Sequence, residues 1–174
     1  MNGTIRALCA CSLVGLGLLQ TPLPPYRGFS AGMSYRAFAE QARALASNDL
    51  LRCNTSANTA QLMECGVSIR DPSDGASFSL RAYVLEQKIL TVSFGDSGNA
   101  DLVSRAQRDL VRRFGPAHPI GHDSWEWRSG HRFARLTWRG RESARWIYVS
   151  LVDQDLMNGI ARYAKAARPS KPAQ

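Results

Sequence analysis

Apolar and polar side chains alternate with a period of two along most of the chain from Gly66 to Leu151. Successive side chains of a β-strand point to opposite faces of a sheet, so the alternation predicts strands that bury one face. Short turns such as Ser129-Gly130 separate the alternating runs and indicate hairpins. The residues expected to face the core are Val67, Ile69, Phe78, Leu80, Ala82, Val84, Leu90, Val92, Phe94, Ala134, Leu136, Trp138, Ile147, Val149 and Leu151. The pattern predicts an antiparallel sheet of about six strands in two meanders, and it leaves open which face Trp125 and Trp127 share.

Four further segments carry apolar residues at helical spacing. Residues 34–47 and 55–65 are predicted as two short N-terminal helices, and residues 99–114 and 154–166 as helices that each follow three strands. The expected capping residues are Ser34, Asn99 and Asp153. We expect the two later helices to pack on one face of the sheet, which leaves the other face for a partner. The predicted fold class is α+β.

Two segments of the chain are similar to each other. Residues 89–96 and 146–153 align without gaps at a spacing of 57 and share Val-Ser and a final Asp. One interpretation is a duplicated βββα unit. The other is that any two amphipathic strands that precede capped helices look alike, and the sequence does not decide between them.

The N-terminus has the layout of a secretory signal peptide. Arg6 is followed by thirteen uncharged residues, 7–19, and then by a Pro-rich segment. This apolar run is too short to span a bilayer. We therefore expect residues 1–30 to be a signal peptide, with cleavage near residues 28–31, and the protein to be periplasmic or extracellular. The alternative is a mitochondrial transit peptide, since the first acidic residue is Glu40.

The remaining chain is expected to form one domain, residues 31–166, followed by a disordered polar tail, residues 167–174. Removal of the leader would leave two of the four cysteines, Cys53 and Cys65. Two cysteines in an exported domain are most simply explained by a disulfide. That bond would stabilise the fold by about 3 kcal/mol.

The chain carries a formal net charge of +8, and nearly all its cations are arginines. Such a charge attracts anionic partners without specifying one. We expect an envelope protein, an acidic glycan or an anionic lipid surface, because an exported protein seldom meets nucleic acid. No motif indicates a cofactor or a metal site. His118 and His122 are four residues apart, but Pro119 and Gly121 exclude the helix that would bring them together.

The segment Gly95-Asp96-Ser97-Gly98 resembles the nucleophile block of GDS-type serine esterases and the nucleophile loop of trypsin-like proteases. The resemblance implies Ser97 as the nucleophile. It covers about six residues, and the later blocks of the esterase family are absent. All three histidines lie downstream of Ser97, whereas a trypsin-like enzyme has its catalytic histidine upstream. The other interpretation is a turn and a helix cap.

The stretch 122–146 contains all four tryptophans and six arginines. Strand parity places five large side chains from this stretch and the residues just after it on the face opposite to the core. They are Phe133, Arg135, Arg139, Trp146 and Tyr148. If that face is open, it offers aromatic rings for stacking and guanidinium groups for carboxylates or phosphates. If it is not, the arginines shield the rings and stabilise the sheet.

The predicted function is therefore an exported, non-enzymatic binding domain that uses these five residues. The alternatives are a structural or envelope-assembly accessory without a small ligand and, third, a small serine hydrolase that uses Ser97.

Overall fold

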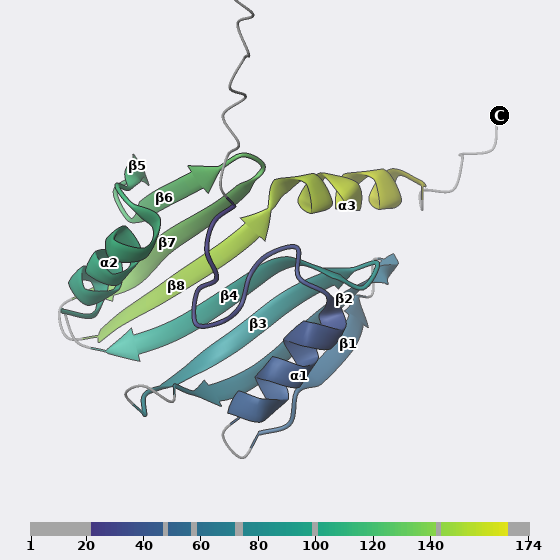
Figure 1. Cartoon of the computed structure of the whole chain (residues 1–174), viewed down its shortest axis with the longest axis horizontal. Helices are drawn as coiled ribbons and strands as arrows, with labels where there is room; N and C mark the ends of the chain where they lie inside the picture. Colours follow the sequence, from purple (N-terminus) through teal and green to yellow (C-terminus); the bar gives the residue numbers. More distant parts are fainter. Residues whose placement is uncertain are drawn as a thin grey trace, which may run out of the picture.

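The computed structural model describes residues 22–46, 49–56, 59–71, 75–98, 101–141 and 144–166 (Figure 1). Within them the chain forms one antiparallel sheet in the order β1-β2-β3-β4-β8-β7-β6-β5, together with three helices. The elements are α1 (Tyr35–Leu45), β1 (Arg52–Ser56), β2 (Thr59–Arg70), β3 (Ser77–Leu85), β4 (Lys88–Gly98), α2 (Asp101–Phe114), β5 (His118–Gly121), β6 (Ser124–Ser129), β7 (Arg132–Arg141), β8 (Ala144–Asp153) and α3 (Gln154–Ala166). The α+β class and the two meanders, β1–β4 and β5–β8, are confirmed.

The sheet has eight strands where the sequence predicts about six. The predicted helix 55–65 is wrong, because this segment contributes to β1 and to the start of β2. Cys53 lies opposite Cys65 in the β1–β2 register, and β2 pairs with β3 from Leu62 onward. This cross-strand pairing overrides the helical spacing of a short polar segment. The other additional strand is β5, which begins at His118.

The two meanders meet at β4 and β8, and their pairing is centred on Ser93 and Ser150. These serines are 57 residues apart, and their hydroxyl oxygens lie 2.8 Å from each other. The separation equals the spacing of the sequence repeat. In the described residues each half has four strands and then a helix, so a duplicated unit, if there is one, would be ββββα instead of βββα. The order of the strands is symmetric about this serine pair.

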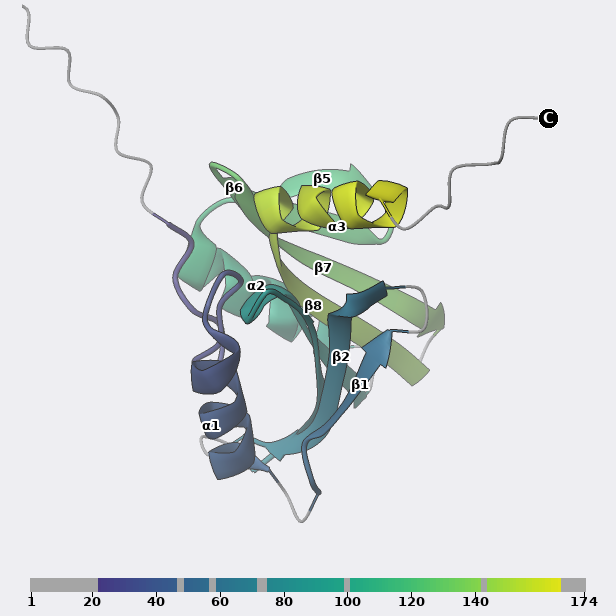
Figure 2. The same cartoon turned by 90° about the vertical axis from the view of Figure 1, so that its right-hand side faces the viewer.

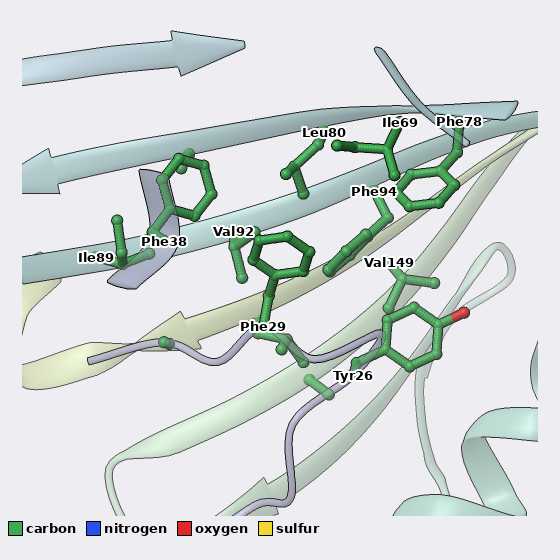
Figure 3. Packing of buried hydrophobic residues seen from close by; sticks show 14 of the residues in the cluster. Tyr26, Phe29, Phe38, Ile69, Phe78, Leu80, Ile89, Val92, Phe94 and Val149 are labelled. Carbon is green, nitrogen blue, oxygen red and sulfur yellow. The ribbon is translucent and has the colours of Figure 1, made fainter. Parts of the chain in front are cut away.

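The main core lies between one face of the sheet and a cover made of α1, α2 and the segment that precedes α1 (Figure 2). A two-residue turn at Arg27-Gly28, with positive φ at both residues, brings Tyr26 and Phe29 together. The rings of Tyr26 and Phe94 meet edge to face at 5.1 Å between centroids (Figure 3). Tyr26 and Phe29 are therefore core residues, and the folded domain begins before the predicted boundary at residue 31.

α2 and α3 do not share one face, which corrects the prediction. α2 buries Ala106 and Leu110 in the main core. α3 crosses the end of the sheet (Figure 2). There the hydroxyl of Thr91 lies 3.5 Å from the sulfur of Met157. Thr91 precedes the core residue Val92 on β4, so its side chain is on the opposite face. α3 therefore covers part of the face that was expected to be free.

Local features of the sequence fix the helix starts. Ser34 caps α1, since its side chain accepts from the backbone N–H of Ala37 at 3.2 Å. Asp153 caps α3 in the same way through Leu156, also at 3.2 Å. The predicted cap Asn99, the leader up to residue 21 and the tail 167–174 lie outside the described residues.

The predicted disulfide between Cys53 and Cys65 is present. It links edge strand β1 to its neighbour β2. Among the described residues, no helix is long and apolar enough to cross a membrane.

Candidate functional site

We define the second face as the side of the sheet opposite to the main core. On its β6–β7–β8 part the side chains belong to Ser124, Glu126, Arg128, Phe133, Arg135, Thr137, Arg139, Trp146, Tyr148 and Ser150. The five residues predicted from the sequence all lie there. The register pairs Arg139 with Trp146 and Arg135 with both Glu126 and Ser150. These pairings divide the five residues into two groups with different surroundings.

The first group is held by Glu126, whose side chain is only 8% exposed. One carboxylate oxygen accepts from Arg128 at 2.7 and 3.1 Å, and the other accepts from Arg135 at 2.8 and 3.3 Å. Both guanidinium groups also lie over the buried ring of Phe133, at 4.9 and 5.0 Å from its centroid. Arg135 and Phe133 are thus occupied by internal partners. We call Glu126, Arg128, Phe133 and Arg135 the locked cluster.

The electrostatics of Glu126 follow from these contacts. Burial alone would raise the pKa of this carboxyl group, but the hydrogen bonds from Arg135 and Arg128 outweigh it and hold the pKa below its ordinary value. The sequence reasoning missed Glu126, although a signal was present. Glu126 stands between Trp125 and Trp127, so if those two face the core, alternation turns Glu126 to the second face.

Replacement of Glu126 by glutamine is expected to lower the free energy of unfolding by about 1–2 kcal/mol at neutral pH. The loss is limited because both arginines keep access to water. Since the pKa is lower in the folded than in the unfolded chain, the contribution of Glu126 is complete at neutral pH and disappears as pH falls below about 4. Denaturant titrations at pH 7 and pH 3 measure this.

The difference in unfolding free energy between Glu126→Gln and the wild type should therefore be smaller at pH 3 than at pH 7. Glu40→Gln is the matched control, because Glu40 forms an exposed ion pair with Arg36 on α1. That variant should stay within about 0.5 kcal/mol of the wild type at both pH values. A Glu126→Gln effect that is independent of pH would contradict the locked cluster.

The second group consists of Arg139, Trp146 and Tyr148, which we call the open group. Trp146 is 53% exposed and Tyr148 is 41% exposed. In the part of the chain that the structure describes, no ion pair involves Arg139. The group borders a shallow open depression of about 470 Å³. Its lining residues are Asp123, Ser124, Thr137, Trp138, Arg139 and Tyr148.

Tyr148 lies across the neighbouring strand β4 at Gly95. A Cβ atom on Gly95 would lie 3.4 Å from the Tyr148 ring, an ordinary contact distance, but only 2.5 Å from the hydroxyl oxygen of Ser79, which is too close. On the other side of Gly95, the hydroxyl of Ser79 donates to the Gly95 carbonyl at 3.3 Å. The space next to Gly95 is thus occupied by the Ser79 hydroxyl, and the Tyr148 ring lies beside it.

The other three tryptophans belong to the core side of the sheet. Trp127 is buried, and its indole N–H donates to the carbonyl of Gly115 at 2.8 Å. Trp125 and Trp138 stack with 4.7 Å between ring centroids. The face of Trp125 and Trp127, which the sequence left open, is therefore the core face. The expectation that Trp138 is core-facing is confirmed.

Ser97 lies near the end of β4, in a groove of about 1130 Å³ beside α2. The neighbouring Asp96 accepts from the backbone N–H of Ser97 at 3.2 Å and forms an ion pair with Arg27 at 3.6 Å. His118 is on β5, four strands from β4 in the sheet order, which is roughly 19 Å. Ser97 pairs with Trp146 near the start of β8. His131 precedes Arg132, which pairs with Asp153 at the other end of β8. His131 and Ser97 therefore lie at opposite ends of this strand.

The groove beside α2 was not found from the sequence. Arg105, Arg108, Arg112 and Arg113 line it, together with Tyr26, whose pKa is raised by burial. Arg27 also reaches Asp71, at 3.5 Å, and lies over the ring of Phe78. Because its contacts join the segment before α1 to the sheet, Arg27 is a structural residue.

Comparisons of the chain with models of protein families, with curated proteins and with solved structures give no match. The function is therefore argued from the site itself.

Proposed function

We propose that the protein is an exported, non-enzymatic binding domain whose contact surface is the open group on the second face. The observation that carries the proposal is the exposure of Trp146 and Tyr148 beside an arginine without an ion pair in the described chain. Large aromatic side chains at a surface cost solvation free energy and are typical of interaction sites. The proposed site is thereby narrower than the five residues predicted from the sequence.

The chemistry of the open group suits an anionic, glycan or protein partner. Trp146 and Tyr148 offer flat rings with a polar edge, and the Arg139 guanidinium can bind a carboxylate with two parallel hydrogen bonds. Aromatic and arginine side chains are also those that contribute most to binding free energy at interfaces.

Export is supported by two features. The disulfide between Cys53 and Cys65 is of the kind that persists in oxidising compartments. The apolar leader is typical of a signal peptide. Because Tyr26 and Phe29 belong to the core, a processed chain that folds in this way must be cleaved before Tyr26.

The hydrolase alternative receives less support. In both families that the Ser97 segment resembles, the general base is a histidine within hydrogen-bond reach of the serine hydroxyl. The register places His118 and His131 far from Ser97, as described above. A structural accessory without a ligand remains the principal alternative, and the following experiment distinguishes it.

The wild-type protein is expected to capture a partner from the exported fraction of its native cells. A Trp146→Ala/Tyr148→Ala variant is expected to lose this partner. The melting temperature should fall only modestly, because Trp146 is 53% exposed and Tyr148 is 41% exposed. Cross-linking followed by mass spectrometry measures retention. Ile120→Ala, which removes an exposed apolar side chain from β5, is the control and should retain the partner. Equal retention by the double variant would favour the structural accessory.

A further inference from the structure

We propose that the second face binds an acidic polysaccharide, with a sugar carboxylate on Arg139 and a pyranose ring stacked on Tyr148. This inference rests on the proposed function and names the class of ligand for the same site. Three features of the face carry it: the aromatic platform, the mixed polar rim and the placement of two arginines that form no ion pair with any described residue.

The platform is built by Tyr148 and Gly95. The Tyr148 ring lies beside Gly95 of β4 and the residue is 41% exposed, so part of the ring is open to solvent. One face of a pyranose ring presents C–H groups, which pack against such a surface as apolar groups do. Trp146 lies two residues before Tyr148 on β8 and faces the same side of the sheet. A second sugar ring could therefore stack on its indole ring.

The rim of the depression favours a sugar over an acidic peptide. Ser124 and Thr137 provide hydroxyl groups that both donate and accept, and Asp123 provides a carboxylate that only accepts. Sugar hydroxyls can donate to Asp123 and accept from Arg139. Aspartate and glutamate side chains offer only acceptors, so they cannot donate to Asp123 as sugar hydroxyls can.

A comparison with the locked cluster explains why Arg81, a second arginine on the same face, has no carboxylate directly opposite it. Across the Ser93–Ser150 pair, Arg81 on β3 occupies the position that corresponds to Arg135 on β7. The residue opposite Arg135 on β6 is Glu126, whereas the residue opposite Arg81 on β2 is Gly66. Arg81 therefore lacks the neutralising carboxylate. It is exposed, and no ion pair within the described chain involves it.

The positions of Arg139, Tyr148 and Arg81 define a path across the face. Tyr148 is one strand from Arg139, and Arg81 is two strands further in the same direction. From the spacing of strands and residues, the two arginines are roughly 20 Å apart. A chain of about four sugar residues is expected to span this path, with a carboxylate near each end.

The test is isothermal titration with oligosaccharides of two to six residues from galacturonate, alginate and hyaluronan. We expect at least one of the three to bind. Complete methyl esterification of that ligand should weaken binding at least about tenfold, as should Arg139→Gln and Tyr148→Ala in the protein. Arg81→Gln should weaken the binding of hexamers more than that of dimers. Arg36→Gln on α1 is the matched control for the loss of one charge and should bind as the wild type does.

Three results would overturn the inference. The first is no binding to any of the three acidic oligosaccharides. The second is equal binding of the methyl esters, which would indicate a neutral sugar. The third is tighter binding of oligoglutamate with the same sensitivity to Arg139→Gln, which would indicate an acidic protein surface. Melting temperatures of all variants identify loss of folding. If the oligosaccharides fail but the Trp146→Ala/Tyr148→Ala variant still loses its native partner, the binding function stands and the ligand class is wrong.

Discussion

A Phe29→Ala variant is expected to lose about 3–5 kcal/mol of unfolding free energy, among the largest effects of any single substitution in the chain. Phe29 is fully buried, and its ring contacts those of Phe38 and Phe94 at centroid distances of 5.7 and 5.9 Å. Because the cavity is enclosed by α1 on one side and the sheet on the other, the neighbours cannot collapse into it without moving an element. Denaturant unfolding followed by circular dichroism measures the loss.

Leu50→Ala is the control, because Leu50 is also a large apolar residue but is exposed. It should change stability by less than about 0.5 kcal/mol. If Phe29→Ala behaved like this control, the segment before α1 would be an appendage and the domain would begin near residue 31. A large loss instead places Tyr26 and Phe29 inside the folding unit, which bears on where the leader can be removed.

Replacement of both Cys53 and Cys65 by alanine is expected to cost about 3 kcal/mol under oxidising conditions. The bond closes a loop between residues 12 positions apart and attaches edge strand β1 to the sheet. Without it, β1 depends on the hydrogen bonds of one short strand pair. Alanine is chosen because Cys65 is fully buried and a serine hydroxyl there would need a partner.

A reductant provides the matching comparison. Wild-type protein treated with dithiothreitol should approach the stability of the double variant, and the double variant itself should not respond. Identical unfolding midpoints of the wild type with and without dithiothreitol would show that the bond does not stabilise the fold.

Much of the sheet could be predicted because its core positions follow a strict period of two. Leu136 and Trp138 on β7, and Val149 on β8, face the core as the alternation indicates. Ser34 and Asp153 could be recognised as caps since their chemistry is local. The strand conformation of segment 55–65 could not be predicted, because it depends on pairing with β3 and on a disulfide across two strands.

The site was predictable only to the level of the face. Parity places Arg135 and Arg139 on the same side of β7, and nothing in the spacing separates their roles. The difference comes from the register between β6 and β7, which puts Glu126 opposite Arg135. The cover of the second face by α3 depends on the path of the chain after β8, which alternation does not encode.

Two substitutions on one strand test the division of the second face most directly. Arg135→Gln and Arg139→Gln remove the same charge from β7, four residues apart, on the same face. Both the unfolding free energy and the retention of the native partner are measured for each. We expect Arg135→Gln to lower stability by about 1–2 kcal/mol and to keep the partner, whereas Arg139→Gln should leave stability within about 0.5 kcal/mol and weaken retention at least about tenfold. The reverse pattern, or two variants that behave alike, would contradict a locked cluster beside an open binding group.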